Sequence, residues 1–508
     1  MGSSQASSPA PGDSVGNPAV VGGSPSTGAK GFGSSYPTRA LLTVTAVALL
    51  VNYVETMVIP GVPTIQHDFS TTSTIASWIT SAFLIVGSAV APLFGKLGDT
   101  YGKKKMVLVS LCFYTFGVGI AGFSPSIYFL LFSRAVQGVG FAIVPLGLAI
   151  IADTFPREKL AQAQGVISGT FAIGAALGLI VGSYVVQDLG WQYAFHTAFI
   201  LSLVLFVLVV KVIKSDTAKA KRKVDYLGAA IMMAWVTLLL VYATEGPTLG
   251  WLSAEELAFL IPGAILTPLW FLFERGRSDP LIELRLLRIR NVLVANMVGL
   301  VSGTVMFLVF FAVVYYSQLP PGFGLNLSII STGLTLAPAT LVMLAVGPVA
   351  GRTVARFGPK PMLFIGAFAM ILGLSLMYFT RATTLELTVG VAAAMAGIVC
   401  TIIPIVNMVA VSLPREETAV GLGINTMLRN LGGAIGPVVA TAIMSSYMAQ
   451  YFFEGQPVPG KFFPTATAFD IIFLTGIVLT LFVVLLSLSV KNYTYKGNNG
   501  ASSSTNQA

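Results

Sequence analysis

The sequence predicts an all-α integral membrane protein with fourteen transmembrane helices, arranged as six, plus two, plus six. Hydrophobic residues make up 55% of the 508 residues and charged residues only 10%, whereas soluble domains carry about 25% charged residues. The hydrophobic residues come in blocks of about twenty, the length of helix that crosses a ~30 Å hydrocarbon core. One motif also occurs twice, at residues 95–108 and 351–364, which indicates two related halves.

Long apolar runs predict the helices in order, and the connectors between them carry turn-forming residues such as "FSPS", "LPPGFG" and "GQPVPG". The fourteen expected spans are residues 40–62, 74–97, 105–123, 127–152, 163–186, 192–213, 226–244, 255–273, 291–316, 328–350, 361–379, 386–411, 418–445 and 467–489.

The two ends of the chain lack the apolar residues needed for a folded core. Residues 1–38 are rich in Gly, Ser, Pro and Ala, and residues 491–508 include "NNGASSSTNQA". We expect both segments to be disordered tails.

Basic residues predict the orientation, because short cytoplasmic connectors carry an excess of Lys and Arg. Of the 29 Lys and Arg residues, two lie deep within expected spans (Arg134 and Arg429) and two in connectors of one side (Arg381 and Lys461). All the others lie on the opposite side, together with both tails. We therefore expect both termini to be cytoplasmic and interpret the net charge of +9 as a topology signal, not as a nucleic-acid surface.

The repeat fixes the layout of the helices. Its first copy, "GKLGDTYGKKKMVL", follows the second span, and its second copy, "GRTVARFGPKPMLF", follows the tenth. Two equal halves of seven would place the second copy after the ninth span. The interpretation is therefore a six-helix bundle at 39–215, an inserted helix pair at 216–280 and a second six-helix bundle at 281–490, a kind of repeat that secondary transporters use.

Several motifs together resemble the major facilitator superfamily, and within it the drug:proton antiporters with fourteen spans. The first repeat copy is similar to the loop signature of that superfamily, and "RAVQGVG" (134–140) is similar to its signature in helix 4. The group with fourteen spans is matched by "WITSAFLIVGSAVAPLFG" (78–95), "PLIELRLLRIRN" (280–291) and "NTMLRNLGGAIG" (425–436). The resemblance covers nearly all of the chain except the tails, and it implies a major-facilitator-like fold and proton-coupled export.

Two positions depart from the pattern of these antiporters. Helix 5 has Gly178-Leu179 and Gly182-Ser183 where a Gly-Pro and a Gly-Gly are usual, and Val54 stands where helix 1 usually carries an aspartate. The first departure leaves open a proton-coupled carrier of a specific metabolite that runs in either direction. The second makes the neighbouring Glu55 a substitute by inference.

Glu55 is the only carboxylate that we place deep within a span. A charged residue at the centre of a membrane helix costs ~2.5–3.5 kcal/mol on insertion scales, so it needs a partner, a water-filled cavity or a proton. Arg134 lies at a similar depth on an antiparallel helix, and Asn52 and Gln137 share faces with Glu55 and Arg134 because residues three apart are neighbours on a helix. The pattern predicts a proton-coupling site, with a static structural pair as the alternative.

The repeated motif suggests a gate on the cytoplasmic side. The resemblance implies that Gly95, Asp99, Gly102, Lys103 and Lys104 form it, with Asp99 as a latch. The alternative is a local interaction of Asp99 with Lys103, Lys104 and Lys105. In the second copy Ala355 replaces Asp99, so such a latch would exist in one half only.

The remaining candidates concern packing and substrate. Small residues permit close approach of membrane helices, so we expect Gly174, Gly178 and Gly182 to pack helix 5. Candidates for a substrate cavity are Asn425, Arg429, Met306, Phe310 and Tyr315. For Arg429 the alternative is a structural role bonded to backbone carbonyls, and for the bulky residues it is contact with lipid or neighbouring helices.

The sequence thus predicts a multi-pass protein of the cell membrane that exports small amphipathic compounds in exchange for protons. A non-transporting receptor or scaffold is a further alternative. We expect no cofactor and no metal site, because His67 and His196 lack metal-ligand spacing, and no enzyme activity. No nucleotide-binding GxxxxGK[ST] motif occurs. The oligomeric state stays open, with a monomer expected.

Overall fold

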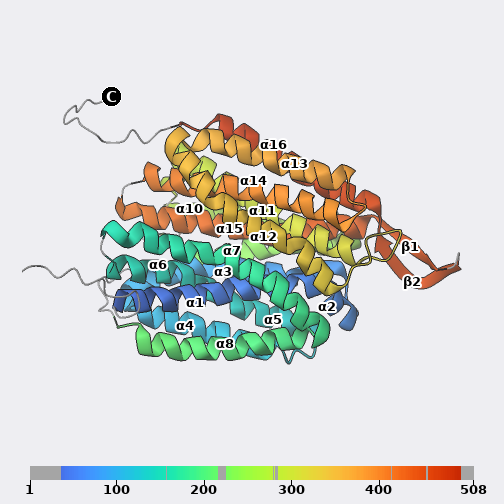
Figure 1. Cartoon of the computed structure of the whole chain (residues 1–508), viewed down its shortest axis with the longest axis horizontal. Coiled ribbons are helices and arrows are strands. Elements are labelled where there is room, and N and C mark those ends of the chain that lie inside the picture. Colours follow the sequence, from blue (N-terminus) through green and yellow to red (C-terminus); the bar gives the residue numbers. More distant parts are fainter. Residues whose placement is uncertain are drawn as a thin grey trace, which may run out of the picture.

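The structure is a computed structural model that describes residues 36–155, 157–215, 225–277, 280, 284–413, 415–453 and 456–492. The predicted tails therefore lie largely outside the described residues. Within the described part of the chain, fourteen helices are long and apolar enough to cross a membrane, which confirms the predicted number. They run side by side along the long axis of the molecule (Figure 1).

The first six spans form the N-terminal half, shown in blue to green in Figure 1. Two of them are interrupted by a short 3₁₀ segment: the first continues through η1 into α2, and the fourth consists of α5, η2 and α6. The elements are α1 (Tyr36–Met57), η1 (Ile59–Gly61), α2 (Val62–Asp68), α3 (Ser73–Tyr101), α4 (Lys103–Ala121), α5 (Ile127–Gly138), η2 (Val139–Ala142), α6 (Ile143–Thr154), α7 (Arg157–Asp188) and α8 (Trp191–Val212).

The last six spans form the C-terminal half, and an inserted helix pair precedes it. The pair consists of α9 (Tyr226–Leu249) and α10 (Ala254–Arg275), which pack on each other, while α9 also contacts α3 and α15. The C-terminal elements are η3 (Leu286–Arg288), α11 (Arg290–Gln318), α12 (Ile329–Phe357), α13 (Pro359–Phe379), α14 (Thr384–Ser412), α15 (Arg415–Ser446), β1 (Met448–Phe453), β2 (Gln456–Pro464) and α16 (Ala466–Leu488).

The two halves repeat the same packing. In the N-terminal half α1 packs on α7 and α4 on α8, and in the C-terminal half α11 packs on α15 and α13 on α16. The halves meet through α3 with α15 and through α7 with α12, which are also matching pairs. This arrangement confirms the predicted layout of six, two and six spans. The boundaries of the sequence segments stay a prediction.

Glycine explains why the motif is repeated. Gly102 joins α3 to α4 with φ of +98°, and Gly358 joins α12 to α13 with φ of +86°. Only glycine adopts such positive φ values without steric cost. Each copy therefore ends one long helix and starts the next without a longer loop.

An antiparallel hairpin is a further element that the sequence did not predict, besides the short 3₁₀ segments. β1 and β2 pair between α15 and α16, with Met448 opposite Pro464. The hairpin projects beyond the helices at one end of the molecule (Figure 1). We call this end the hairpin end, and the opposite end, where α1 starts and α16 finishes, the terminal end. The sequence predicted only a connector here.

Candidate functional site

Glu55 lies near the end of α1 that faces the hairpin, in the interior of the protein. Its exposed fraction is 3%, and its Oε2 atom is buried without a hydrogen-bond partner. Among the residues that the structure describes, no ion pair includes Glu55. The carboxylate is therefore not held in a static pair with Arg134, and it retains unused capacity to accept a hydrogen bond or a proton.

Arg134 of α5 is fully buried and bonded within its own half. Its Nε donates to the carbonyl of Ile79 at 2.8 Å, and its Nη1 donates to Gln137 Oε1 at 2.7 Å. The guanidinium lies 4.4 Å from the centre of the Phe83 ring, a cation–π contact. Gln137 in turn donates to the carbonyl of Gly117 at 3.2 Å. These contacts fix Arg134 to α3, and through Gln137 to α4.

Arg429 of α15 belongs to the other half and differs from Arg134. It is only partly buried, and within the described part of the chain its guanidinium has no hydrogen-bond acceptor, so the expected bonds to backbone carbonyls are not found. Its guanidinium carbon lies 5.9 Å from the centre of the Phe171 ring of α7. Arg429 and, to a smaller extent, Arg134 attract Glu55 electrostatically, so one cation from each half acts on the carboxylate.

Asn52, which the sequence placed beside Glu55, bonds to the backbone of its own helix and not to Glu55. Its Nδ2 donates to the carbonyl of Ala48 at 2.7 Å. Tyr114 of α4, which sequence reasoning missed, lies in the same electrostatic neighbourhood as Glu55 and Arg134. Its hydroxyl donates to the carbonyl of Leu50 at 3.4 Å. No motif marks this tyrosine in the sequence, because only the packing of α4 on the centre of the half brings it near.

Helix α1 is positioned by a stripe of glycines on α7. A β-carbon on Gly174 would lie 2.7 Å from Asn52 Cβ, one on Gly178 would lie 2.5 Å from the carbonyl oxygen of Tyr53, and one on Gly182 would lie 2.6 Å from Met57 Cα. The two backbones are therefore in direct contact along the segment that carries Glu55. Thr56 Oγ1 also donates to the carbonyl of Ala175 at 3.2 Å.

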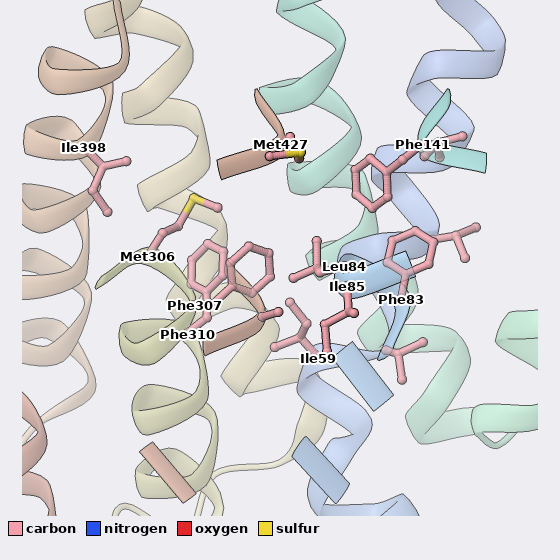
Figure 2. Close-up of a cluster of buried hydrophobic side chains, with 14 of the residues drawn as sticks. Ile59, Phe83, Leu84, Ile85, Phe141, Met306, Phe307, Phe310, Ile398 and Met427 are labelled. Atoms are coloured by element: carbon pink, nitrogen blue, oxygen red, sulfur yellow. The ribbon is translucent and has the colours of Figure 1, made fainter. Parts of the chain in front are cut away.

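An apolar cluster closes the space between the halves beside this site. Figure 2 shows Leu84 and Ile85 of α3 on the side toward Met306, Phe307 and Phe310 of α11, with Phe83 of α3 and Phe141 of η2 behind them. The proposed cavity residues Met306 and Phe310 are 4% and 2% exposed. They are thus packed in this core, and in this structure they line no open cavity.

The other two cavity candidates make polar contacts within the protein. Asn425 donates from Nδ2 to the carbonyl of Ala295 at 3.0 Å and to Asn296 Oδ1 at 3.1 Å, so it connects α15 to α11. Tyr315 donates to Gln66 Oε1 at 2.8 Å and thereby links the two halves.

Further hydrogen bonds join the halves near the hairpin end. Gln318 Nε2 donates to the carbonyl of Pro60 at 2.7 Å, and the amide of Ile330 donates to Gln187 Oε1 at 3.0 Å. Thr74 and Ser445 lie 2.9 Å apart through their hydroxyl groups. These bonds hold the two halves together at the hairpin end.

The candidate gate motif lies at the terminal end. Lys103 binds Asp153 at 2.5 Å and Lys104 donates to the carbonyl of Val210 at 2.9 Å, so both connect α4 to other helices of the same half. A β-carbon on Gly95 would meet nothing within 4 Å. The side chain of Asp99 lies outside the described residues, and its role as a latch stays a prediction.

Comparisons with known proteins agree with this architecture. The model of the Major Facilitator Superfamily matches residues 44–437. The chain is 27% identical over 417 residues to the multidrug resistance protein Stp of Mycobacterium tuberculosis (strain CDC 1551 / Oshkosh), covering 80% of this chain and 76% of that protein. It is 27% identical over 454 residues to the tetracenomycin C resistance and export protein of Streptomyces glaucescens, covering 86% and 80%.

The fold is also found among solved structures. The xylose transporter XylE from E. coli, in a partially occluded inward open conformation, superimposes with a TM-score of 0.60 at 15% identity, covering 92% of this chain and 100% of that one. Its likeness supports the fold, and the family match extends over most of the chain. The chain belongs to the Major Facilitator Superfamily.

Proposed function

We propose that this transporter exports small amphipathic compounds in exchange for protons, and that Glu55 is the carboxylate which takes up and releases the proton. The observation that carries the proposal is the state of Glu55: a buried carboxylate with an unpartnered oxygen and without an ion pair, which is attracted by one cation from each half. Such intramembrane carboxylates are rare and typical of proton pathways, because they are costly unless they are neutralised.

Relatives support export as the direction of transport. The two similar proteins named above are called a multidrug resistance protein and a resistance and export protein. We place the transporter in the plasma membrane, and the positive-inside rule supports an orientation with the basic terminal end in the cytoplasm. The hairpin end would then face outward, and the bonds near it would close the outer side.

Exchange requires that proton and substrate compete for one site while access alternates between the two sides. A positively charged group bound beside the Glu55 carboxylate and a proton on that carboxylate exclude each other. One proton that enters across 100 mV of membrane potential supplies ~2.3 kcal/mol. For a substrate without net charge this is enough to drive accumulation on the outer side by about fiftyfold, whereas exchange for a monovalent cation moves no net charge and is driven by the pH gradient alone.

Glu55→Gln tests this role. Glutamine keeps the shape of the side chain but releases no proton, so we expect uptake driven by a pH gradient in proteoliposomes to stop while exchange without a gradient persists. A protein that depends on Glu55 for folding would instead lose thermal stability, since removing one member of a buried charge network is destabilising. Normal gradient-driven transport by a stable Glu55→Gln variant would refute the proposal.

A further inference from the structure

The two halves present opposite charges to each other, and each charge has unused bonding capacity. Glu55 of α1 is buried with its Oε2 unpartnered. Arg429 of α15 is partly accessible and donates no hydrogen bond to the protein within the described residues. The two residues attract each other electrostatically but form no ion pair. Phe171, whose ring centre lies 5.9 Å from the Arg429 guanidinium carbon, belongs to α7, the helix that contacts α1 along the segment carrying Glu55. The two charged groups therefore belong to one cluster, and a ligand that reaches this cluster can satisfy both.

Arg134 shows what a structural arginine looks like in the same protein. Its Nε and Nη1 bind protein acceptors at 2.8 Å and 2.7 Å, and it is fully buried. Its third nitrogen, Nη2, is buried without a partner. Arg429 differs because it is partly accessible and none of its nitrogens donates to the protein within the described residues. The Arg429 guanidinium is therefore available to an acceptor from outside the protein.

The surroundings of Arg429 specify the chemistry of that acceptor. A planar guanidinium binds carboxylate, phosphate or sulfonate oxygens through two parallel hydrogen bonds. The Phe171 ring lies 5.9 Å from the guanidinium carbon, so an aromatic surface adjoins the anion position. The Glu55 carboxylate offers the complementary position for a positively charged amine.

We propose that the central site binds zwitterionic amphipathic compounds, with their anionic group on Arg429, their cationic group on Glu55 and an aromatic body beside Phe171. This inference rests on the proposed function, whose site it specifies. Glu55 is buried in the present state, so the ligand enters in another state of the transport cycle.

A zwitterionic ligand is consistent with exchange for a proton. Protonation of Glu55 removes the partner of the ligand's cationic group, so proton and zwitterion compete. A compound with only an anionic group gains nothing from the ionised carboxylate, which repels it. Arg429 therefore selects among compounds that carry a cationic group, and it favours those that also carry an anion at the right distance.

Two dyes with one skeleton test the inference. Rhodamine 110 carries a free carboxylate, whereas rhodamine 123 is its methyl ester and is a cation only. Equilibrium binding to the purified full-length protein in nanodiscs is measured by fluorescence anisotropy for wild type, Arg429→Gln and Arg429→Lys. The matched control is Lys461→Gln, which removes one positive charge from an exposed position on β2.

We expect Arg429→Gln to weaken rhodamine 110 binding about 10- to 100-fold, the usual effect of losing a hydrogen bond to a charged group. Rhodamine 123 binding should change less than about twofold by the same reasoning, because the ester presents no charge to Arg429. Arg429→Lys keeps the charge but not the planar fork and should fall between the two. Lys461→Gln should match wild type with both dyes.

An equal effect of Arg429→Gln on both dyes, or no effect on either, overturns the inference. Thermal stability of each variant shows whether the site is intact, and Arg429→Lys supplies the test if Arg429→Gln unfolds. The proposed function is tested separately by transport of rhodamine 123 under a pH gradient. Loss of that transport in Glu55→Gln, together with equal dye binding in Arg429→Gln, would leave the proton exchange standing and remove the zwitterion site.

Discussion

Replacing Gly178 by alanine should displace Glu55 without touching it. The added β-carbon would lie 2.5 Å from the carbonyl oxygen of Tyr53 and 3.0 Å from the amide nitrogen of Met57, and it would also contact Thr56 Oγ1. Two of these three neighbours are backbone atoms of α1, so no change of side-chain rotamer relieves the contact. Helix α1 must therefore move away from α7, and Glu55 moves with it.

The size of the effect follows from two opposing contributions. Overpacking of this kind typically costs ~1–3 kcal/mol, whereas alanine stabilises a helix relative to glycine by about 0.8–1 kcal/mol. Gly169, on the same helix, has nothing within 4 Å of its β-carbon position. Gly169→Ala therefore gains the helix contribution alone. The difference in unfolding free energy between the two variants isolates the overpacking, and we expect it to be ~1–3 kcal/mol.

The assay is equilibrium unfolding in mixed detergent micelles, paired with gradient-driven transport in proteoliposomes. Gly178→Ala should be less stable than Gly169→Ala and slower in transport, while Gly169→Ala should transport like wild type. If both variants are equally stable, the backbone contact between α1 and α7 is not as close as described, and the positioning argument for Glu55 fails.

Two further predictions concern the hairpin end and the orientation. Tyr315→Phe removes the hydrogen bond to Gln66, which is worth about 0.5–1.5 kcal/mol. A cysteine at the buried Val186 should therefore be labelled about 2- to 12-fold more often in this variant. Unchanged labelling would show that this bond does not hold the halves closed. Cysteines at the exposed Ser70 and Arg288 should react with impermeant reagents from opposite sides of the membrane, with Ser70 outside. Labelling of both from one side would contradict the topology.

Local patterns in the sequence were enough to predict the helices. A block of apolar residues has few alternatives to a membrane helix, so the fourteen spans follow directly. The repeated glycines at 102 and 358 were visible as a motif, and their positive φ values explain it. The hairpin at 448–464 was missed because Pro457 and Pro459, which are unfavourable in strands, lie within the strand β2.

The candidate site was only partly predictable, because it depends on how the halves face each other. Depth along a helix can be counted from the sequence, and it placed Arg134 level with Glu55. The rotation of α15 about its axis cannot be counted in this way. This rotation directs Arg429 toward Phe171 of the opposite half and Asn425 toward α11 of its own half. The spacing of residues along one helix does not show which neighbouring helix each side chain faces.

The position of Glu55 along α1 connects the central charge to the hairpin end. Five residues beyond it, the carbonyl of Pro60 accepts a hydrogen bond from Gln318 of the other half. On the other side, α1 contacts α7 through its glycine stripe, and Gln187 of α7 binds the amide of Ile330. A shift of α1 toward Arg429 or away from it therefore strains two bonds between the halves at once. In the proposed exchange, a proton on Glu55 would remove its attraction to Arg429 of the other half, so the charge state of one carboxylate would bias contacts at a distance without a separate relay. This is the physical requirement for coupling: one element with two arrangements whose balance both the proton and the substrate change.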